Sequence, residues 1–445
     1  MNPASLIGHA VELLKLIDGS KQPADKIVSN FFHDRRYLGS KDRRWISETL
    51  FGMIRNRRYI EALLEQYLIE HPFHVDLDAS QRRHLPLYAA YATTRPDANP
   101  AEISSALWKT SFPAIELSSF VESIRQHQSL EFLGDDPIIR LGVKHSFQDW
   151  MVQEWLEQFD GECENLLQVL NRPANITLRV NTRKASLEDC QIRLESNGIG
   201  TTPARLAPAG LVASKRFNAQ TTTAFTDGWF EMQDEGSQIV SLLAHPAPGN
   251  VVIDACAGTG GKSLHLAELM NDQGELIAID VDAGRLRELE RRAARAGIHC
   301  VKPVLAGDVQ AENFFSKADL VLVDAPCSGV GTIRRNPAFK WSVTEDLVDH
   351  YAGMQSAILG DNSRYVKPGG RLVYVTCSLL RKENEEVVDK FLAGHPEFQP
   401  VESDDAVARY GLVMKNGCVK LLPHLHDTDG FGIFIFRRVA SDLTI

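Results

Sequence analysis

From Val251 onward, short apolar segments alternate with segments of helical periodicity, and this alternation constrains the fold more than any other feature of the chain. The apolar segments read VVIDAC, LIAID, VKPVLAGD, DLVLVDAP and RLVYVTCS. Strands that alternate with helices along a chain form a doubly wound parallel sheet. We therefore predict an α/β domain with a Rossmann-like sheet over residues 241–445, and we expect its ligand at the carboxyl ends of the strands.

Two further regions precede this domain. Residues 1–140 have apolar side chains at helical spacing, for example Ile46, Leu50 and Ile54, which predicts an all-α domain. Residues 141–240 contain the alternating segment ITLRVNT among helical patterns, which predicts a linker helix and a small α+β domain. A chain of 445 residues has room for three such domains.

The charge of the chain limits how it could bind nucleic acid. The net charge is −10, which excludes a protein that coats nucleic acid by bulk charge but allows a local basic surface. Residues 34–58 carry eight basic and three acidic side chains, and Arg43 and Arg44 are among the basic ones. Phosphate binding is one explanation of this excess, but runs of charge are more often a solvated helix face.

Several classes of protein are excluded by the remaining composition. The chain has no apolar run of membrane-spanning length and no secretory signal pattern, which predicts a cytoplasmic protein without a membrane partner. Seven scattered cysteines without a C-x-x-C pair predict reduced thiols and no zinc site. His424 and His426 stand in a polar turn, where such a pair is more often a loop feature, so we predict no metal. We expect a monomer.

A glycine-rich loop follows the first predicted strand, and three ligand classes compete for it. Its residues are Cys256, Ala257, Gly258, Thr259, Gly260, Gly261 and Lys262. A nicotinamide site requires G-x-G-x-x-G, but Ser263 occupies the third glycine position. A P-loop NTPase would use Gly261-Lys262-Ser263, but Cys256 stands where that motif needs its first glycine. The third ligand is S-adenosyl-L-methionine, whose uncharged adenosine needs no phosphate cradle.

Aspartates at successive strand ends favour the adenosyl cofactor. Asp280 ends the second strand, where a ribose diol requires a carboxylate. Asp308 ends the third strand beside the expected adenine, and Asp324 ends the fourth beside the expected methyl donor. Each aspartate alone could be a helix cap or a turn residue. Together, at one edge of the sheet, they favour S-adenosyl-L-methionine over the other two ligands.

Two cysteines also follow strand ends, so their thiols should reach the same edge of the sheet. Cys327 lies in Pro-Cys-Ser and Cys377 in Thr-Cys-Ser. A single cysteine is more often a small buried apolar residue, but two thiols beside a cofactor loop favour chemistry. Methylation of carbon 5 of a pyrimidine explains the pair, because that carbon becomes nucleophilic only after a thiolate adds to carbon 6.

The chain resembles the Sun-type RNA 5-methylcytosine methyltransferases, and in particular their bacterial branch that acts on small-subunit ribosomal RNA. The resemblance lies in DACAGTGGK, VDAPCSGVGTIRRNPAFKW, VTCSLLRKENEEVV and LLPHLHDTDGFGIFIFRR, in the order of the family. Residues 1–140 resemble the helical NusB-type RNA-binding domain of that branch, and residues 174–232 resemble its small ferredoxin-like domain. The resemblance implies a class I methyltransferase domain and two domains that bind RNA.

The resemblance also implies roles for single residues. Cys377 would be the nucleophile that adds to carbon 6, and Cys327 would assist release of the product. Asp324 would contact the cytosine and the cofactor. The glycine-rich loop would hold the methionine end of S-adenosyl-L-methionine, Asp280 its ribose and Asp308 its adenine.

One departure from the family is visible in the cofactor loop. The family's usual loop is CAAPGGK, and here Gly258-Thr259 replaces Ala-Pro. Glycine keeps a close approach of the ligand possible, so the departure bears on the rigidity of the loop more than on its ligand.

Basic residues after the Pro-Cys motif complete the predicted site. Arg334, Arg335 and Lys340 could hold RNA phosphates, although a solvated patch beside a helix would look the same. The predicted function is methylation of cytosine carbon 5 in RNA, with small-subunit rRNA as the expected substrate. The alternatives are a tRNA methyltransferase of the same chemistry, a P-loop NTPase and a non-catalytic ribosome-assembly factor.

Overall fold

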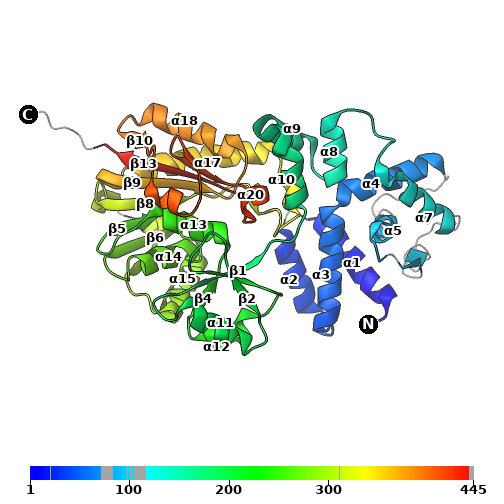
Figure 1. Ribbon diagram of the computed structural model, residues 1–445, viewed down its shortest axis with the longest axis horizontal. Helices are drawn as coiled ribbons and strands as arrows, with labels where there is room; N and C mark the ends of the chain where they lie inside the picture. The colour runs from blue at the N-terminus through cyan, green and yellow to red at the C-terminus, as the bar shows by residue number, and fades with distance from the viewer. Residues whose placement is uncertain are drawn as a thin grey trace, which may run out of the picture. The chain divides into compact units, whose positions relative to one another are not determined.

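The computed structural model describes residues 1–20, 22–71, 84–97, 99–100, 103–104, 117–309 and 311–439. The chain forms two compact units, which Figure 1 colours along the sequence. The first, called here the helical unit, comprises Met1–Arg172 and Ile333–Ser342. The second, called here the sheet unit, comprises Pro173–Thr332 and Val343–Ile445.

Amphipathic helices build the helical unit around one core. They are α1 (Pro3–Asp18), α2 (Ala24–Asp34), α3 (Ser40–Arg55), α4 (Arg57–Glu70), α5 (His84–Thr94), α7 (Leu117–Gln126), α8 (Pro137–His145), α9 (Asp149–Phe159) and α10 (Cys163–Leu170). Ile46, Leu50 and Ile54 of α3 are buried in this core, as their helical spacing predicts. The Asp136 side chain caps α8 by accepting two backbone N–H groups. The predicted all-α start of the chain is therefore confirmed for the described residues.

A later segment of the chain also packs into the helical unit. Ile333–Ser342 includes the short helix α16 (Phe339–Ser342) and belongs to this unit rather than to the sheet unit around it in sequence. Ala338 is buried in the helical core, and the Trp341 indole donates to the Ile54 carbonyl over 2.8 Å. This packing could not be predicted, because a short polar segment does not indicate its partner.

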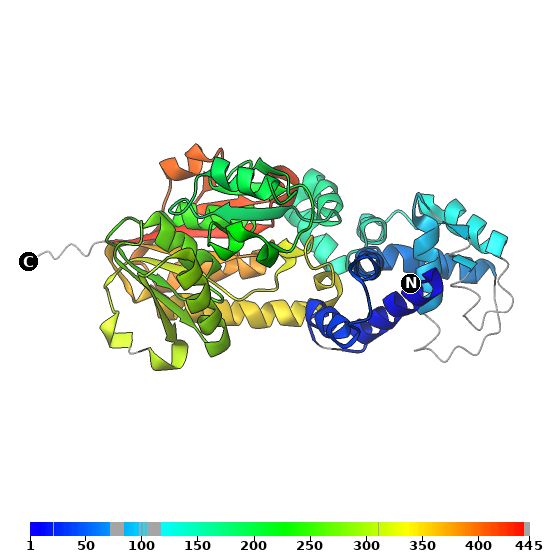
Figure 2. The same cartoon turned by 90° about the horizontal axis from the view of Figure 1, so that it is seen from below.

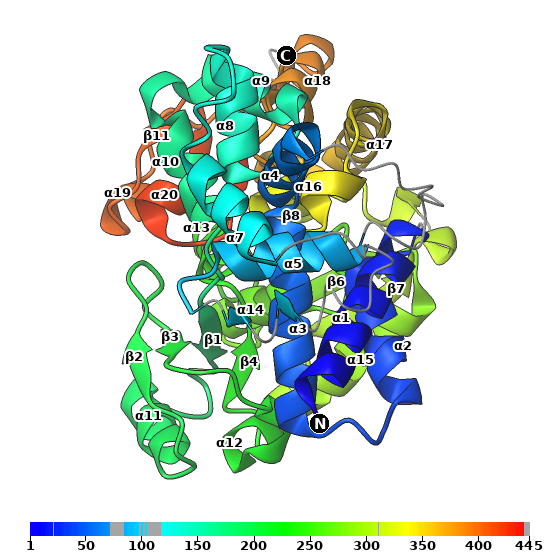
Figure 3. The same ribbon diagram turned by 90° about the vertical axis from the view of Figure 1, so that its right-hand side faces the viewer.

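The sheet unit begins with a small antiparallel sheet. Its strands are β1 (Ile176–Val180), β2 (Thr201–Pro203), β3 (Gly210–Ala213) and β4 (Phe230–Met232), with the helices α11 (Leu187–Glu195) and α12 (Thr223–Thr226). Figure 3 shows the strands side by side in the order β2-β3-β1-β4. Leu178, Leu194 and Phe230 share its core. The predicted small α+β fold is confirmed.

The large sheet carries the strand ends that matter for the site. Its strands are β5 (Val251–Asp254), β6 (Glu275–Asp280), β7 (Val301–Leu305), β8 (Ala318–Asp324), β9 (Val366–Thr376), β10 (Phe398–Pro400), β11 (Met414–Lys415), β12 (Cys418–Leu421) and β13 (Phe431–Arg438). The parallel part has the order β7-β6-β5-β8-β9, and β13 pairs antiparallel with β9. The strand order reverses direction at β5, so a crevice for a ligand is expected beyond its carboxyl end.

Helices cover both faces of this sheet. On one face lie α13 (Glu235–Ala244), α14 (Gly261–Leu269) and α15 (Ala283–Ala296), and on the other lie α17 (Glu345–Ser363) and α18 (Glu385–Gly394). Figures 1 and 2 show α17 as the long yellow helix. Successive strand residues point to opposite faces, so Val252 packs with the first set and Ile253 with the second. The predicted Rossmann-like fold is confirmed.

Candidate functional site

The loop between β5 and α14 presents its backbone at the carboxyl edge of the sheet. Gly258 and Gly260 have φ values of +55° and +86°, which glycine adopts without strain. A Cβ at Gly260 would lie 2.6 Å from Cγ of Leu289, so the loop also needs glycine there for space. At Gly258, by contrast, such a Cβ would have no heavy atom of the described residues within 4 Å apart from those of Gly258 and its two neighbours in the chain. The loop is therefore open above Gly258, where a ligand could approach the backbone.

Carboxylates surround this loop. Asp280 at the end of β6 is 6% exposed, and its Oδ2 accepts the Gly258 N–H over 2.8 Å. Burial raises the pKa of Cys256, and the charges of Asp254, Asp324 and Asp280 raise it further. Asp308 lies exposed beyond β7. The negative field suits a ligand with a cationic centre and hydroxyl groups, and it opposes a triphosphate.

The loop lysine is already paired. Lys262 Nζ donates to Asp324 Oδ2 over 2.6 Å and lies 5.6 Å from the centre of the Phe431 ring. Burial lowers the pKa of Lys262, but the charge and hydrogen bond of Asp324 outweigh it and hold the pKa above its usual value. Because Asp324 neutralises Lys262, the lysine is not arranged to grip phosphates as in a P-loop. An adenosyl group with a sulfonium fits these residues better.

The two predicted cysteines meet beside this loop. Cys327 follows β8 and Cys377 follows β9, and their Sγ atoms are 3.2 Å apart. The hydrogen bond to Cys377 raises the pKa of Cys327 well above its usual value, and burial and the charge of Glu383 act in the same direction. The two thiols are therefore within hydrogen-bonding distance, and either sulfur can be the donor. Cys377 is partly exposed and can face a substrate.

A buried carboxylate that sequence reasoning missed supports the cysteine pair. Glu383 is fully buried and accepts both the N–H and the hydroxyl of Ser328, the residue after Cys327. Gln355 of α17 also donates to Glu383, over 3.2 Å. Glu383 itself follows Cys377 by six positions, so it ties the two cysteine loops together. Its only signal in the sequence is a run of charged residues, which is more often a solvated surface.

Lys340 was predicted to contact RNA, and the structure corrects that prediction. Its side chain is fully buried, and its ammonium donates to the Arg55 carbonyl over 2.8 Å and to the His145 carbonyl over 3.0 Å. The third acceptor is Asn171 Oδ1 at 2.5 Å, and the Phe147 ring centre lies 3.8 Å away. These contacts use all three donors of the ammonium. Lys340 therefore anchors Ile333–Ser342 within the helical unit.

The arginines predicted to bind RNA differ in exposure. The Arg44 side chain is 79% exposed and pairs with Glu48 over 2.8 Å. Arg43 is half-buried and donates to the Leu38 carbonyl. Arg335 is exposed, whereas Arg334 is only 4% exposed. Arg44 and Arg335 are therefore exposed residues, whereas Arg334 is buried.

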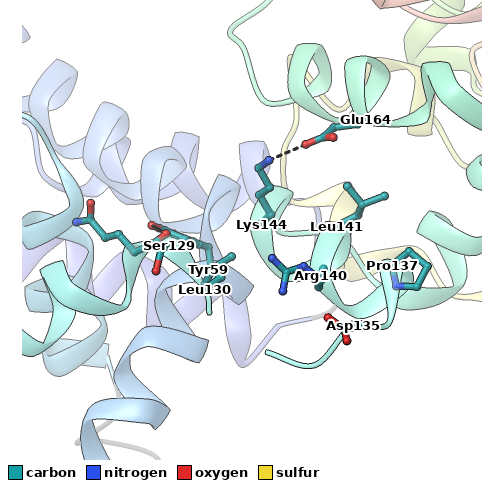
Figure 4. Close-up of a pocket in the computed structure, with 10 residues that line it drawn as sticks. Tyr59, Ser129, Leu130, Asp135, Pro137, Arg140, Leu141, Lys144 and Glu164 are labelled. Atoms are coloured by element: carbon teal, nitrogen blue, oxygen red, sulfur yellow. Dashed lines mark hydrogen bonds and ion pairs between the residues drawn. The ribbon is translucent and has the colours of Figure 1, made fainter. Parts of the chain in front are cut away.

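The helical unit also contains an open pocket of about 580 Å³ (Figure 4). Its charged lining residues are Asp135, Arg140, Lys144 and Glu164. Lys144 donates to Glu164 over 2.7 Å, and Figure 4 marks this ion pair. Two cations and two carboxylates balance each other, so the pocket does not match a polyanionic RNA backbone.

Two further observations concern the part of the chain that the structure describes. It contains no group of three or more His, Cys, Asp or Glu side chains arranged to hold a metal ion. None of its helices combines the length and the apolar character that a bilayer crossing requires.

Comparison with known proteins adds independent findings. A family model described as 16S rRNA methyltransferase RsmB/F matches residues 241–437. A second model, described as the ferredoxin-like domain of Methyltr_RsmF/B-like proteins, matches residues 147–220. The first match covers the large sheet, and the second runs from α9 through α10 to the first three strands of the small sheet.

Whole-chain relatives extend this similarity. The chain is 32% identical to the "Probable ribosomal RNA small subunit methyltransferase B" of Synechocystis sp., over 90% of this chain and 92% of the relative. It is 31% identical to the protein of the same name from Bacillus subtilis, over 98% of this chain and all of the relative. The crystal structure of PH0851 is 28% identical and superimposes with a TM-score of 0.74, covering 98% of this chain and 99% of that one.

Proposed function

The chain belongs to the RsmB/F family of 16S rRNA methyltransferases, and we propose that it methylates carbon 5 of a cytosine in small-subunit rRNA through a covalent adduct with Cys377. The main support for this reaction is the pair of thiols of Cys327 and Cys377, which lie 3.2 Å apart beyond the ends of β8 and β9. A methyltransferase that attacks nitrogen or oxygen needs no thiol, whereas carbon 5 of cytosine does.

The cofactor of this reaction is S-adenosyl-L-methionine, which supplies a methyl group on a cationic sulfonium. The backbone of residues 256–262 would hold its methionine end, and Asp280 would accept hydrogen bonds from its ribose hydroxyls. Asp308 would lie at its adenine. The carboxylates around Cys256 favour the sulfonium electrostatically, which supports this cofactor over ATP.

The cysteines divide the covalent chemistry between them. The short distance between the two sulfurs places Cys327 where it could donate its S–H to Cys377 Sγ during the reaction. The thiolate would add to carbon 6, and electron density would move through the ring toward N3, which would take up a proton beside Asp324. Carbon 5 would then take the methyl group as its bond to the sulfonium breaks, with S-adenosylhomocysteine as the leaving group, and the carbon-5 proton would pass to water. The bond between sulfur and carbon 6 breaks with the assistance of Cys327, which frees the product.

We infer the substrate from the family and from the fact that the thiolate attacks the face of the cytosine ring. A thiol that adds to a ring face needs an unpaired or flipped cytosine, so rRNA that is not yet buried in the assembled subunit is the preferred target. Such a substrate implies a cytoplasmic enzyme. A tRNA substrate would use the same residues, and only a comparison of RNAs separates the two.

Two cysteine variants test the roles. Cys377→Ala removes the nucleophile, so we expect no turnover and no covalent complex. Cys327→Ala should allow attack but hinder release, so a covalent protein–RNA complex should appear on a denaturing gel. Cys418→Ala, which removes another partly exposed thiol from β12, serves as the control and should resemble the natural protein. An active Cys377→Ala enzyme would refute the assignment.

A P-loop NTPase and a non-catalytic assembly factor predict different properties. A P-loop NTPase would be stabilised against heat by ATP with magnesium, and we expect stabilisation by S-adenosyl-L-methionine instead. A non-catalytic assembly factor would have no need for Cys327, Cys377 and Asp324 at one edge of the sheet. Their arrangement therefore supports an enzyme.

A further inference from the structure

Side chains from three separate elements hold the cofactor loop at three of its residues. The Gly258 N–H donates to Asp280 of β6. The Gly261 carbonyl accepts from Arg179 of β1 over 2.9 Å. Between these two anchors, Thr259 is held by Arg292 of α15.

The contact between Arg292 and Thr259 uses two acceptors of one residue. Arg292 Nη1 donates to the Thr259 carbonyl over 2.8 Å and to its Oγ1 over 2.9 Å. The other edge of the same guanidinium donates to Glu231 Oε2, over 3.2 Å from Nε and 3.0 Å from Nη2. Glu231 is buried and the Arg292 side chain is 13% exposed, so Glu231 fixes the direction in which Arg292 points.

The loop needs such an anchor because glycine flanks Thr259 on both sides. Gly258 and Gly260 have left-handed φ values and more conformational freedom than any other residue type would have. A proline would restrict the backbone directly, and the related loop CAAPGGK has one at this position. Threonine has no ring to fix its φ angle, but its hydroxyl offers an acceptor that proline lacks.

We propose that Arg292 and Thr259 form a clamp that holds the loop in its cofactor-binding conformation. Both are positioning residues, since Arg292 acts through Thr259 and the backbone. The inference rests on the proposed use of S-adenosyl-L-methionine and identifies what sets the affinity of that same site.

The clamp predicts a loss of affinity rather than a loss of chemistry. Without the clamp, the loop of the unliganded protein samples conformations that cannot bind the cofactor. Cofactor binding must then reorder the loop. Thr259→Val keeps the shape of the side chain but removes the acceptor, and Arg292→Met removes both hydrogen bonds. Each should weaken cofactor binding about five- to twenty-fold, with a smaller change in kcat at saturating cofactor.

The test is calorimetric binding of S-adenosylhomocysteine to the full-length protein and its variants. If the clamp operates as a unit, the double variant Thr259→Val/Arg292→Met should bind no more weakly than Arg292→Met alone. Thr259→Ser, which retains the hydroxyl, should recover most of the affinity lost in Thr259→Val. Thr259 is exposed, so its substitution does not disturb the core.

Arg295→Met provides the matched control. Arg295 pairs with the same Glu231 and lies 3.8 Å over the Phe225 ring, on the same helix as Arg292. We expect its affinity to stay within about two-fold of the natural protein. Equal losses of affinity for S-adenosylhomocysteine in Arg295→Met and Arg292→Met would overturn the inference. They would show that the loss comes from the missing partner of Glu231 and not from the missing contact with Thr259. Unchanged affinity in Thr259→Val and Arg292→Met would overturn it too.

The same titration separates this inference from the proposed function. If the natural protein failed to bind S-adenosylhomocysteine, the proposed cofactor would be wrong and the clamp with it. If the natural protein bound and the affinities of the variants fell as described, both would stand.

Discussion

Asp254, at the end of β5, makes the stability of the folded protein depend on pH. Its carboxyl is buried and accepts from the Ser263 hydroxyl over 2.6 Å. Burial raises its pKa from 3.8 to about 6 despite that hydrogen bond. The unfolded chain therefore releases this proton near pH 4, whereas the folded protein holds it until about pH 6. Over that window the folded state binds more protons, so the contribution of Asp254 to stability falls as pH rises.

Asp254→Asn tests this dependence. The amide keeps the shape and an acceptor for Ser263 but does not ionise, so the variant should gain stability relative to the natural protein between pH 4 and pH 7. A shift of about two pKa units corresponds to about 3 kcal/mol at most. Urea unfolding of both proteins at several pH values gives the difference. Parallel stability curves would contradict the prediction.

The site residues differ in how far the sequence predicts them. The sequence places Cys327, Cys377 and Asp324 near one another because each stands at or just after the end of a strand of a parallel sheet, and strand ends meet at one edge. Glu383 and Arg292 could not be identified, because their partners Ser328 and Thr259 lie far away in the sequence. Buried polar residues of this kind look like surface charges until the fold brings their partners to them.

At the scale of elements, the alternation after Val251 predicts the parallel sheet and the order in which strands and helices follow. The resemblance in four motifs is also confirmed by the family match. The packing of Ile333–Ser342 into the helical unit was not predictable, and it made the expectation for Lys340 wrong. A basic residue shortly after the Pro-Cys motif suggests a phosphate contact. Three oxygens that accept hydrogen bonds from one ammonium can instead stabilise it in a buried position.

Lys340→Met tests the anchoring of this segment. The substitution leaves the acceptors on Arg55, His145 and Asn171 without the ammonium, which should destabilise the helical unit by about 2–4 kcal/mol. Hydrogen exchange should rise in Ile333–Ser342 and at the end of α3. Arg335→Ala, an exposed position in the same segment, is the control and should exchange like the natural protein. Equal exchange in all three proteins would show that Lys340 anchors nothing.

At the scale of the whole molecule, a net charge of −10 must be reconciled with a polyanionic substrate. RNA binding then depends on local cations, and we propose Arg44 and Arg335 of the helical unit for that role. Each accessible cation that meets a phosphate adds to affinity at low salt and steepens the salt dependence. The double variant Arg44→Ala/Arg335→Ala should lower RNA affinity several-fold and reduce the salt slope by about two.

The control for this prediction is Arg364→Ala. Arg364 is 56% exposed and pairs with Asp361 at the end of α17, much as Arg44 pairs with Glu48. Filter binding of unmodified rRNA at several salt concentrations compares the variants. If Arg364→Ala weakened binding as much as the double variant, net charge rather than a local surface would govern RNA affinity.

Nucleoside mass spectrometry of methylated RNA can show whether the protein methylates carbon 5 of cytosine in small-subunit rRNA. The protein is incubated with labelled S-adenosyl-L-methionine and, separately, naked small-subunit rRNA, assembled subunits and bulk tRNA. We predict labelled 5-methylcytosine mainly in the naked rRNA, and none when Cys377→Ala replaces the natural protein. Label in a different nucleoside, or in no RNA although the cofactor binds, would contradict the account.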